Sequence, residues 1–214
     1  MTAKERAVET EKILKKLYPG AKCNLDFTDP LELLVATVLS AQCTDERVNK
    51  VTQALFKKYR NAADYANAPI EQLEEDVRQT GFYKNKAASI RKACSAIVEK
   101  HGGKVPGSME ELTKLAGVGR KTANVVLGNA FGVPGIVVDT HVGRISQRLK
   151  LTKNSDPEKI ERDLMPLVPQ KDWTGFSHRM IHFGRDICQA KKPKCGQCPL
   201  ETICPWEEKG KFKG

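Results

Sequence analysis

Leu115–Ala123 reads LAGVGRKTA and joins two apolar segments that favour helix. Gly117 and Gly119 stand where the chain must reverse, and glycine adopts backbone angles that cost other residues energy. Val118 lies between them, where its side chain can anchor the turn in the core. We therefore expect a hairpin between two helices, the second of which begins at about Arg120.

Such a hairpin directs backbone N–H groups outward at the positive end of a helix dipole, a geometry that binds phosphate. Lys121, in the first turn of the second helix, would then lie next to a bound phosphodiester. The Gly-x-Gly pattern is weak evidence alone, because an ordinary corner between two helices with a solvated lysine has the same sequence. The rest of the chain has to distinguish these interpretations.

Composition favours a globular protein with an anionic partner. Hydrophobic residues make up 40% of the 214 residues and charged residues 29%. No apolar run reaches the roughly 20 residues that a membrane helix needs, and residues 1–6 lack the apolar centre of a signal peptide. We therefore expect a cytoplasmic protein with no membrane partner. The formal net charge is +10, of which residues 120–214 contribute +7, and this surplus favours nucleic acid.

The local signals along the chain are almost all helical. Residues 29–32 (DPLE) combine a capping residue, a proline in the first turn and a glutamate placed to reach back. The apolar run 33–39 that follows predicts a buried central helix, and a capping box at 108–111 predicts the helix that leads into the hairpin. Residues 136–138 (IVV) are too short and isolated to indicate a sheet. Further helices are expected at 5–17, 45–59, 69–78, 85–100, 122–131, 139–150, from 156, and at 171–188, so the predicted fold class is all-α.

Four of the seven cysteines are clustered near the C-terminus. Their spacing is C-x6-C-x2-C-x5-C, from Cys188 through Cys195 and Cys198 to Cys204, so four thiolates can close around one metal centre. Zinc and a [4Fe–4S] cluster are both chemically possible. Structural zinc usually brings two closely spaced cysteine pairs, and only one such pair is present here. The spacing therefore favours iron–sulfur.

A basic loop lies between the first two of these cysteines. It contains Lys191, Lys192 and Lys194. A metal centre would fix this loop and present three positive charges to a phosphate backbone, although a solvated loop explains the lysines equally well.

The glycine hairpin, Lys121, Asp139 eighteen residues later and the cysteine pattern occur together. In this combination the chain resembles the endonuclease III family of the helix-hairpin-helix DNA glycosylase superfamily, from about Leu31 to Cys204. The resemblance implies two helical lobes with a DNA cleft between them. Residues 23–134 would form a six-helix barrel domain, with the helix-hairpin-helix at about 108–131. Residues 1–22 and 135–214 would form a discontinuous domain whose four-cysteine loop 188–204 holds a [4Fe–4S] cluster.

The resemblance also implies base excision repair by a bifunctional DNA glycosylase and abasic-site lyase. Such an enzyme removes oxidised pyrimidines from duplex DNA and cleaves the strand 3′ to the abasic site. Lys121 matches the family's nucleophile and Asp139 its catalytic aspartate. A carboxylate stabilises the positive charge that base displacement builds on the sugar, and an amine that attacks C1′ forms a Schiff base that permits β-elimination. A plain helix cap is the ordinary alternative for Asp139.

A base cannot be reached inside a duplex, so such enzymes flip the nucleotide out of the stack. The resemblance assigns Gln42 to the resulting void and Phe82 to a wedge in the opposite strand, where an apolar side chain is suitable. Asp45 follows the same loop as Gln42 and could contact the flipped base. The ordinary alternatives are a solvated or capping amide for Gln42, a core or staple residue for Phe82 and a helix cap for Asp45.

Two positions depart from the family pattern. Ala116 replaces the proline that usually precedes Gly-Val-Gly, which removes roughly 0.4–1 kcal/mol of preorganisation if the backbone there suits proline. Phe82 stands where the family often has leucine and could alter the preferred opposite base. Neither change touches the chemistry.

Four further polar residues have plain structural explanations. His178, His182 and Asp186 follow one another at intervals of four, a spacing that could hold a metal, but we expect packing or hydrogen bonds there. His141, beside Asp139, is expected to be structural.

Two other functions share parts of this pattern. Adenine and mismatch-thymine glycosylases generally lack a lysine at the end of the hairpin and use water as nucleophile, so Lys121 argues against them. A module that only binds DNA or carries electrons would need neither Lys121 nor Asp139. We therefore expect a monomeric, nucleoid-associated enzyme whose partner is double-stranded DNA with an oxidised pyrimidine or an abasic site.

Overall fold

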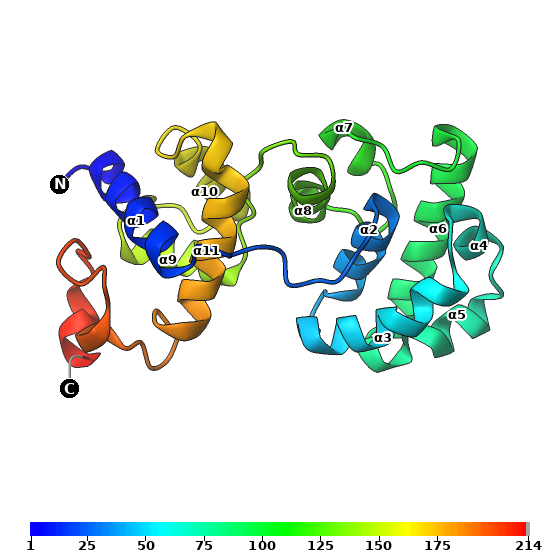
Figure 1. The fold of residues 1–214 in the computed structure, drawn as a ribbon, viewed down its shortest axis with the longest axis horizontal. Helices are drawn as coiled ribbons and strands as arrows, with labels where there is room; N and C mark the ends of the chain where they lie inside the picture. The colour runs from blue at the N-terminus through cyan, green and yellow to red at the C-terminus, as the bar shows by residue number, and fades with distance from the viewer. Residues whose placement is uncertain (213–214) are drawn as a thin grey trace. The chain divides into compact units, whose positions relative to one another are not determined.

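The computed structural model describes residues 1–212, which fold entirely into helices, turns and loops (Figure 1). No strand forms within this range, so the predicted all-α class is confirmed. The chain divides into two compact units, one from Cys23 to Val133 and one that combines Met1–Lys22 with the chain from Pro134 onward. Their assignment as a six-helix barrel and a cluster domain stays a prediction. Residues 213 and 214, the end of that second predicted domain, lie outside the described residues.

The Cys23–Val133 unit contains seven α-helices and one 3₁₀ turn among its described residues. These are α2 (Pro30–Leu39), α3 (Asp45–Lys58), α4 (Ala62–Asn67), α5 (Ile70–Val77), η1 (Arg78–Thr80), α6 (Tyr83–His101), α7 (Met109–Leu112) and α8 (Arg120–Ala130). The longest, α6, packs against α2, α4 and α5. It is therefore the central helix of this unit.

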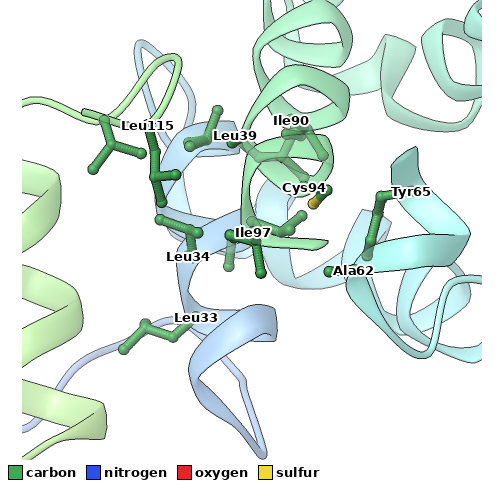
Figure 2. Packing of buried hydrophobic residues seen from close by; sticks show 14 of the residues in the cluster. Leu33, Leu34, Leu39, Ala62, Tyr65, Ile90, Cys94, Ile97 and Leu115 are labelled. Atoms are coloured by element: carbon green, nitrogen blue, oxygen red, sulfur yellow. The ribbon is translucent and has the colours of Figure 1, made fainter. Parts of the chain in front are cut away.

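The core of this unit is built around one face of α6. Ile90, Cys94 and Ile97 recur at helical spacing on that face and are almost completely buried. Figure 2 shows these three side chains between Tyr65 of α4 and Leu34 of α2. Helices α2, α4 and α6 share one apolar cluster, and this packing fixes the ends of the helices from which the loops begin.

The start signal at residues 29–32 acts as expected. The Asp29 side chain accepts a hydrogen bond from the Glu32 N–H at 2.9 Å, and Pro30 occupies the first turn of α2. The Glu32 carboxylate reaches back to the N–H of Thr28 at 2.6 Å. Residues 33–39 are all buried, so the prediction of a buried helix here is confirmed, although α6 and not α2 is the central helix of the unit.

Two elements differ from the expectation. Helix α4 was not foreseen, although Asn61 and Asp64 form a capping box at its start. The helix that begins at Ser108 has only four residues, because the chain turns almost at once into the glycine hairpin.

The second unit contains α1 (Ala3–Leu17), α9 (Thr140–Arg148), α10 (Pro157–Leu164) and α11 (Trp173–Asp186), with 3₁₀ turns η2 (Gln170–Asp172), η3 (Cys195–Gln197) and η4 (Glu207–Phe212). Helix α11 packs against both α1 and α9 (Figure 1). Phe176, Met180 and Phe183 of α11 are buried in the core between them. The N-terminal helix is thus an integral part of this unit.

A buried ion pair joins α1 to α11. Arg179 donates from both Nε and Nη2 to the carboxylate of Glu11, with 3.1 Å between Nε and Oε2, and both residues are buried. Lys15 lies 3.4 Å from the same carboxylate.

Across residues 1–212, no helix has the length and apolar character needed to cross a membrane.

We expect Glu11→Gln to lower the free energy of unfolding by about 3 kcal/mol, because it leaves the buried Arg179 guanidinium without a counter-charge. Urea denaturation followed by circular dichroism measures this change. The matched control is Glu9→Gln, which removes an exposed pair with Lys12 and is expected to cost less than about 1 kcal/mol. An equal loss of unfolding free energy in the two variants would show that the buried ion pair stabilises the protein no more than the exposed one.

Candidate functional site

The glycine hairpin has the geometry that the sequence indicates. The N–H of Val118 donates to the carbonyl of Leu115 at 3.2 Å, and the Val118 side chain is buried. Gly117 adopts a φ of +75°, in the left-handed region that favours glycine. Gly119 is the N-cap residue of α8, and no side chain caps the first turn of that helix.

The hairpin is pressed against α6 at one point. A Cβ on Gly117 would lie 2.7 Å from Cβ of Ser89, closer than real Cβ atoms approach. Gly117 is therefore required for its backbone angle and also for this close contact. Gly119 meets neither demand, since nothing lies within 4 Å of a Cβ added there.

Lys121 and Asp139 each occupy the first turn or the start of a helix. Lys121 is the second residue of α8, with an exposed side chain. Asp139 caps α9, where its Oδ1 accepts hydrogen bonds from the N–H groups of His141 at 2.9 Å and Val142 at 2.8 Å. Asp139 does serve as a cap, and because both bonds end on Oδ1, the second oxygen stays outside the cap.

The surroundings of Asp139 are cationic and tightly packed. Arg144 lies 3.2 Å from Nδ1 of His141 and donates to the carbonyls of Gly184 and Cys188. Burial lowers the pKa of His141 and so favours the neutral ring. His141 thus has the structural role that we expected.

Gln42 and Phe82 share an unusual backbone conformation. Their φ angles are 52° and 48°, and Lys150 is the one other non-glycine residue in the described chain with positive φ. Such angles are costly for bulky side chains and mark constrained positions. Gln42 is exposed and Phe82 is 63% exposed, so Phe82 is not a core residue.

The residue that caps α3 is Thr44 and not Asp45. The Thr44 side chain accepts from the N–H of Arg47 at 3.3 Å. Asp45 is the first residue of the helix and accepts from Nδ2 of Asn24 at 3.4 Å. The capping alternative for Asp45 is therefore wrong.

The four clustered cysteines line one pocket of the second unit. Cys188, Cys195, Cys198 and Cys204 are all free thiols that line a small cavity of about 30 Å³. Ile145, Leu149, Phe183 and Leu200 contribute an apolar wall. Four thiols along the wall of one partly apolar pocket are the donor set and the surroundings that iron–sulfur clusters use.

Arg148 connects this pocket to its surroundings. Its Nη1 lies 3.2 Å from Sγ of Cys188 and 2.8 Å from the carbonyl of Gln189, and its guanidinium stacks over Trp206 at 3.9 Å. Burial raises the pKa of the Cys198 thiol to about 11. Burial also raises the pKa of the Cys195 and Cys204 thiols, and the positive charges of Arg148 and Lys209 oppose that shift toward the thiol form. Metal binding needs thiolates, so these two cations act in its favour.

The basic loop is fixed at both ends. Lys191, Lys192 and Lys194 are all exposed. The N–H of Lys194 donates to the carbonyl of Ile187 at 2.9 Å, and Arg148 donates to the carbonyl of Ala190 at 3.0 Å. The loop thus presents its charges from a defined backbone.

The His178–His182–Asp186 row is a packing feature. His178 is buried, which lowers its pKa to about 4. The ring of His182 stacks on Tyr18, with 5.8 Å between centroids, and Asp186 interacts with the same tyrosine. Within residues 1–212 no group of three or more His, Cys, Asp or Glu side chains is arranged to hold a single metal ion.

Our sequence reading overlooked Lys86 and Arg148. Lys86 is buried on α6, and Arg148 is the cation at the cysteine pocket. A signal for Lys86 was present, because it falls at core spacing beside Ala87, Ile90 and Cys94. The partners of Arg148 lie about 40 residues away along the chain, so no local pattern shows them.

We expect Gly117→Ala to destabilise the protein by about 1–3 kcal/mol, because alanine tolerates neither the positive φ nor the contact with Ser89. The affinity for duplex DNA should fall roughly tenfold as the hairpin shifts. Thermal melting and a binding titration at fixed salt measure the two effects. Gly119→Ala is the stability control and should change the unfolding free energy by less than about 0.5 kcal/mol. An unchanged melting temperature in Gly117→Ala would contradict the packing argument.

Comparison with known proteins agrees with this geometry. Residues 35–170 match the model of the HhH-GPD superfamily base excision DNA repair proteins, and residues 188–206 match the iron–sulfur binding domain of endonuclease III. The chain is 59% identical to endonuclease III of Synechocystis over 203 residues, which cover 94% of this chain and 93% of the relative.

Solved structures give the same relationship. A trapped endonuclease III–DNA covalent intermediate superposes with a TM-score of 0.93 at 48% identity, over 99% of each chain. A thermostable thymine-DNA glycosylase has a TM-score of 0.87 at 23% identity, over 96% of this chain and 98% of that one, which is a likeness of fold alone. The matched cysteine segment means that this chain carries a [4Fe–4S] cluster. The chain therefore belongs to the endonuclease III family of base excision repair enzymes, which are DNA glycosylases and abasic-site lyases.

Proposed function

We propose that this chain excises oxidised pyrimidines from duplex DNA with Lys121 as nucleophile and Asp139 as the assisting carboxylate. The observation that supports it best is the exposed Lys121 in the first turn of α8, directly after a glycine hairpin and at a helix start that no side chain caps. A hairpin of this kind holds a phosphate, and a lysine beside it meets the adjoining sugar.

The chemistry assigned to Lys121 proceeds in two stages. The neutral Nζ attacks C1′ of the deoxyribose, the bond from C1′ to the base breaks, and the base leaves with the electron pair and takes up a proton. Attack and base loss leave an N,O-acetal at C1′, which carries both Nζ and O4′. The nitrogen lone pair then breaks the C1′–O4′ bond, O4′ takes up a proton, and the opened sugar is held as a protonated Schiff base. The Schiff base makes the 2′ proton acidic, and its removal expels the 3′ phosphate by β-elimination.

Asp139 has the complementary role in the first stage. Its carboxylate would stabilise the positive charge that develops at C1′ and O4′ as the base departs. The cap on α9 fixes Oδ1 through two backbone N–H groups, which orients the carboxylate before DNA binds. The oxygen outside the cap is the one assigned to the sugar.

The DNA contacts follow from charge and shape. The hairpin residues Gly117–Arg120 would bind a phosphate of the damaged strand through backbone N–H groups other than that of Val118, which donates to Leu115 within the turn. Exposed Gln42 would occupy the void and Phe82 would separate the bases opposite, as amide and apolar side chains can. Asp45 would contact the flipped base.

The cluster lobe would add a second, sequence-independent contact. Lys191, Lys192 and Lys194 would bind the phosphate backbone, since a fixed loop holds all three exposed. We assign Cys188, Cys195, Cys198 and Cys204 as the cluster ligands. When bound, the [4Fe–4S] cluster cross-links these cysteines and so holds the loop between them.

The proposed enzyme acts as a monomer in the cytoplasm, at the nucleoid, where its substrate lies. A water-using glycosylase on the same scaffold is the main competing function. The two are distinguished by the lysine, because only an amine nucleophile gives a covalent intermediate that a hydride donor can trap.

We expect borohydride to trap the protein on a duplex with one thymine glycol, and Lys121→Gln to abolish the covalent band because the amide is not nucleophilic. Denaturing gel electrophoresis detects the band. The control is Lys114→Gln, which removes an exposed lysine paired with Glu110 and should leave trapping intact. Strand breaks that appear only after alkali would contradict the lyase assignment.

Asp139→Asn should separate the two roles of this residue. Asparagine caps helices about as well as aspartate, so the unfolding free energy should change by less than about 0.5 kcal/mol. Loss of the charge should slow excision by roughly 10²–10³-fold in single-turnover assays. Asp156→Asn, the same change at the cap of α10, should leave excision unaffected. A parallel loss of stability and excision in Asp139→Asn would mean that the residue is only a cap.

A further inference from the structure

Lys86 is a buried lysine that the proposed chemistry does not use. It lies on α6 with only 5% of its surface exposed. Its Nζ donates to the carbonyl of Leu39 at 2.8 Å and to the carbonyl of Thr80 at 2.7 Å. Burial disfavours the charged form and lowers the pKa of this ammonium, so its position is maintained at a cost in free energy.

The two carbonyls mark the starts of two loops. Leu39 is the last residue of α2 and precedes Gln42 by three residues. Thr80 ends η1 and precedes Phe82 by two residues. The Lys86 Nζ therefore binds the residues from which both loops begin (the loop roots), and these residues are about 40 positions apart in the sequence.

Both hydrogen bonds satisfy groups that regular structure leaves open. The carbonyl of Leu39 is one of the last in α2, where no later turn supplies an N–H and where the negative end of the helix dipole favours a cation. Thr80 is buried, so its carbonyl needs a partner inside the protein. The two carbonyls together need a donor with at least two N–H groups, and the Lys86 ammonium supplies them.

The loops that Lys86 joins are the strained ones. Gln42 and Phe82 are the two non-glycine residues with positive φ in the Cys23–Val133 unit. Each such conformation costs of order 1–3 kcal/mol and persists only where neighbouring contacts fix it. Lys86 supplies a common contact for both.

The same helix also supports the glycine hairpin. Ser89, one turn beyond Lys86 on α6, meets the backbone at Gly117. Helix α6 thus sets the positions of three loops, those of Gln42, Phe82 and the hairpin.

We propose that Lys86 is a positioning residue that fixes Gln42 and Phe82 relative to each other, so that both act on one base pair of the duplex. This inference rests on the roles proposed above for these two side chains. Lys86 itself touches no DNA. Its ammonium sets the spacing of the two loop roots, and the rate at which a paired base is extruded depends on that spacing.

The test compares Lys86→Met, which keeps the stem and removes the ammonium, with Lys100→Met, an exposed lysine at the far end of α6. Single-turnover excision is measured on one oxidised pyrimidine placed in a duplex or in a bubble of unpaired nucleotides. We expect Lys86→Met to lose roughly tenfold or more on the duplex and less than roughly threefold on the bubble, where no base pair has to be opened. Lys100→Met should match the parent on both.

If Lys86 only stabilised the fold, its replacement would change other measured quantities. It would lower the melting temperature and reduce both rates in parallel, and that outcome would overturn the proposal. Additivity is the second readout: Lys86→Met should add little to the duplex defect of a Gln42→Ala/Phe82→Ala variant, because it acts through those residues. A full additional loss would also overturn it.

Two controls keep the outcomes distinct. Borohydride trapping on the bubble reports Lys121 chemistry alone, so its absence in the parent protein would reject the proposed function and not the role of Lys86. If Lys86→Met does not fold, Lys86→Arg retains the charge and several donors. It should excise from the bubble as the parent does and be slower on the duplex, and equal duplex rates would overturn the proposal.

Discussion

The packing of α6 through the Cys23–Val133 unit is the constraint on which the candidate site depends. Its apolar face holds α2 and α4 in the core, and its polar positions Lys86 and Ser89 hold loops. Loops are usually the variable part of a protein, yet here three of them are fixed to one helix. Because α6 holds all three loops, each of these short segments has a defined position.

The second unit is organised by a different interaction. Arg148 binds the carbonyls of Gln189 and Ala190, the sulfur of Cys188 and the face of Trp206. A single guanidinium thereby joins α9 to the loop of the cysteine segment. Because the planar group offers five donors in a fixed fork, lysine could not replace these contacts.

Both residues proposed for catalysis depend on a helix start. The residue proposed as nucleophile follows a glycine cap, and the residue proposed as carboxylate is itself a cap. Both lie at helix starts, where backbone N–H groups supply partial positive charge in addition to that of any side chain. Most of the excess formal charge, +7 of +10, lies from residue 120 onward, and the exposed lysines of the cysteine segment belong to it.

Local chemistry explains what the sequence alone determined. Capping residues and proline fix the start of α2, glycine fixes the hairpin, and cysteine spacing identifies the cluster segment, because each depends on neighbours within a few residues. Tertiary structure alone decided the contacts of Lys86, the pressure of Ser89 on Gly117 and the partners of Arg148. It also showed that Thr44, and not Asp45, caps α3. Each of these contacts depends on which atoms come within hydrogen-bond or packing distance once the chain has folded. Periodicity and motif spacing do not predict such distances.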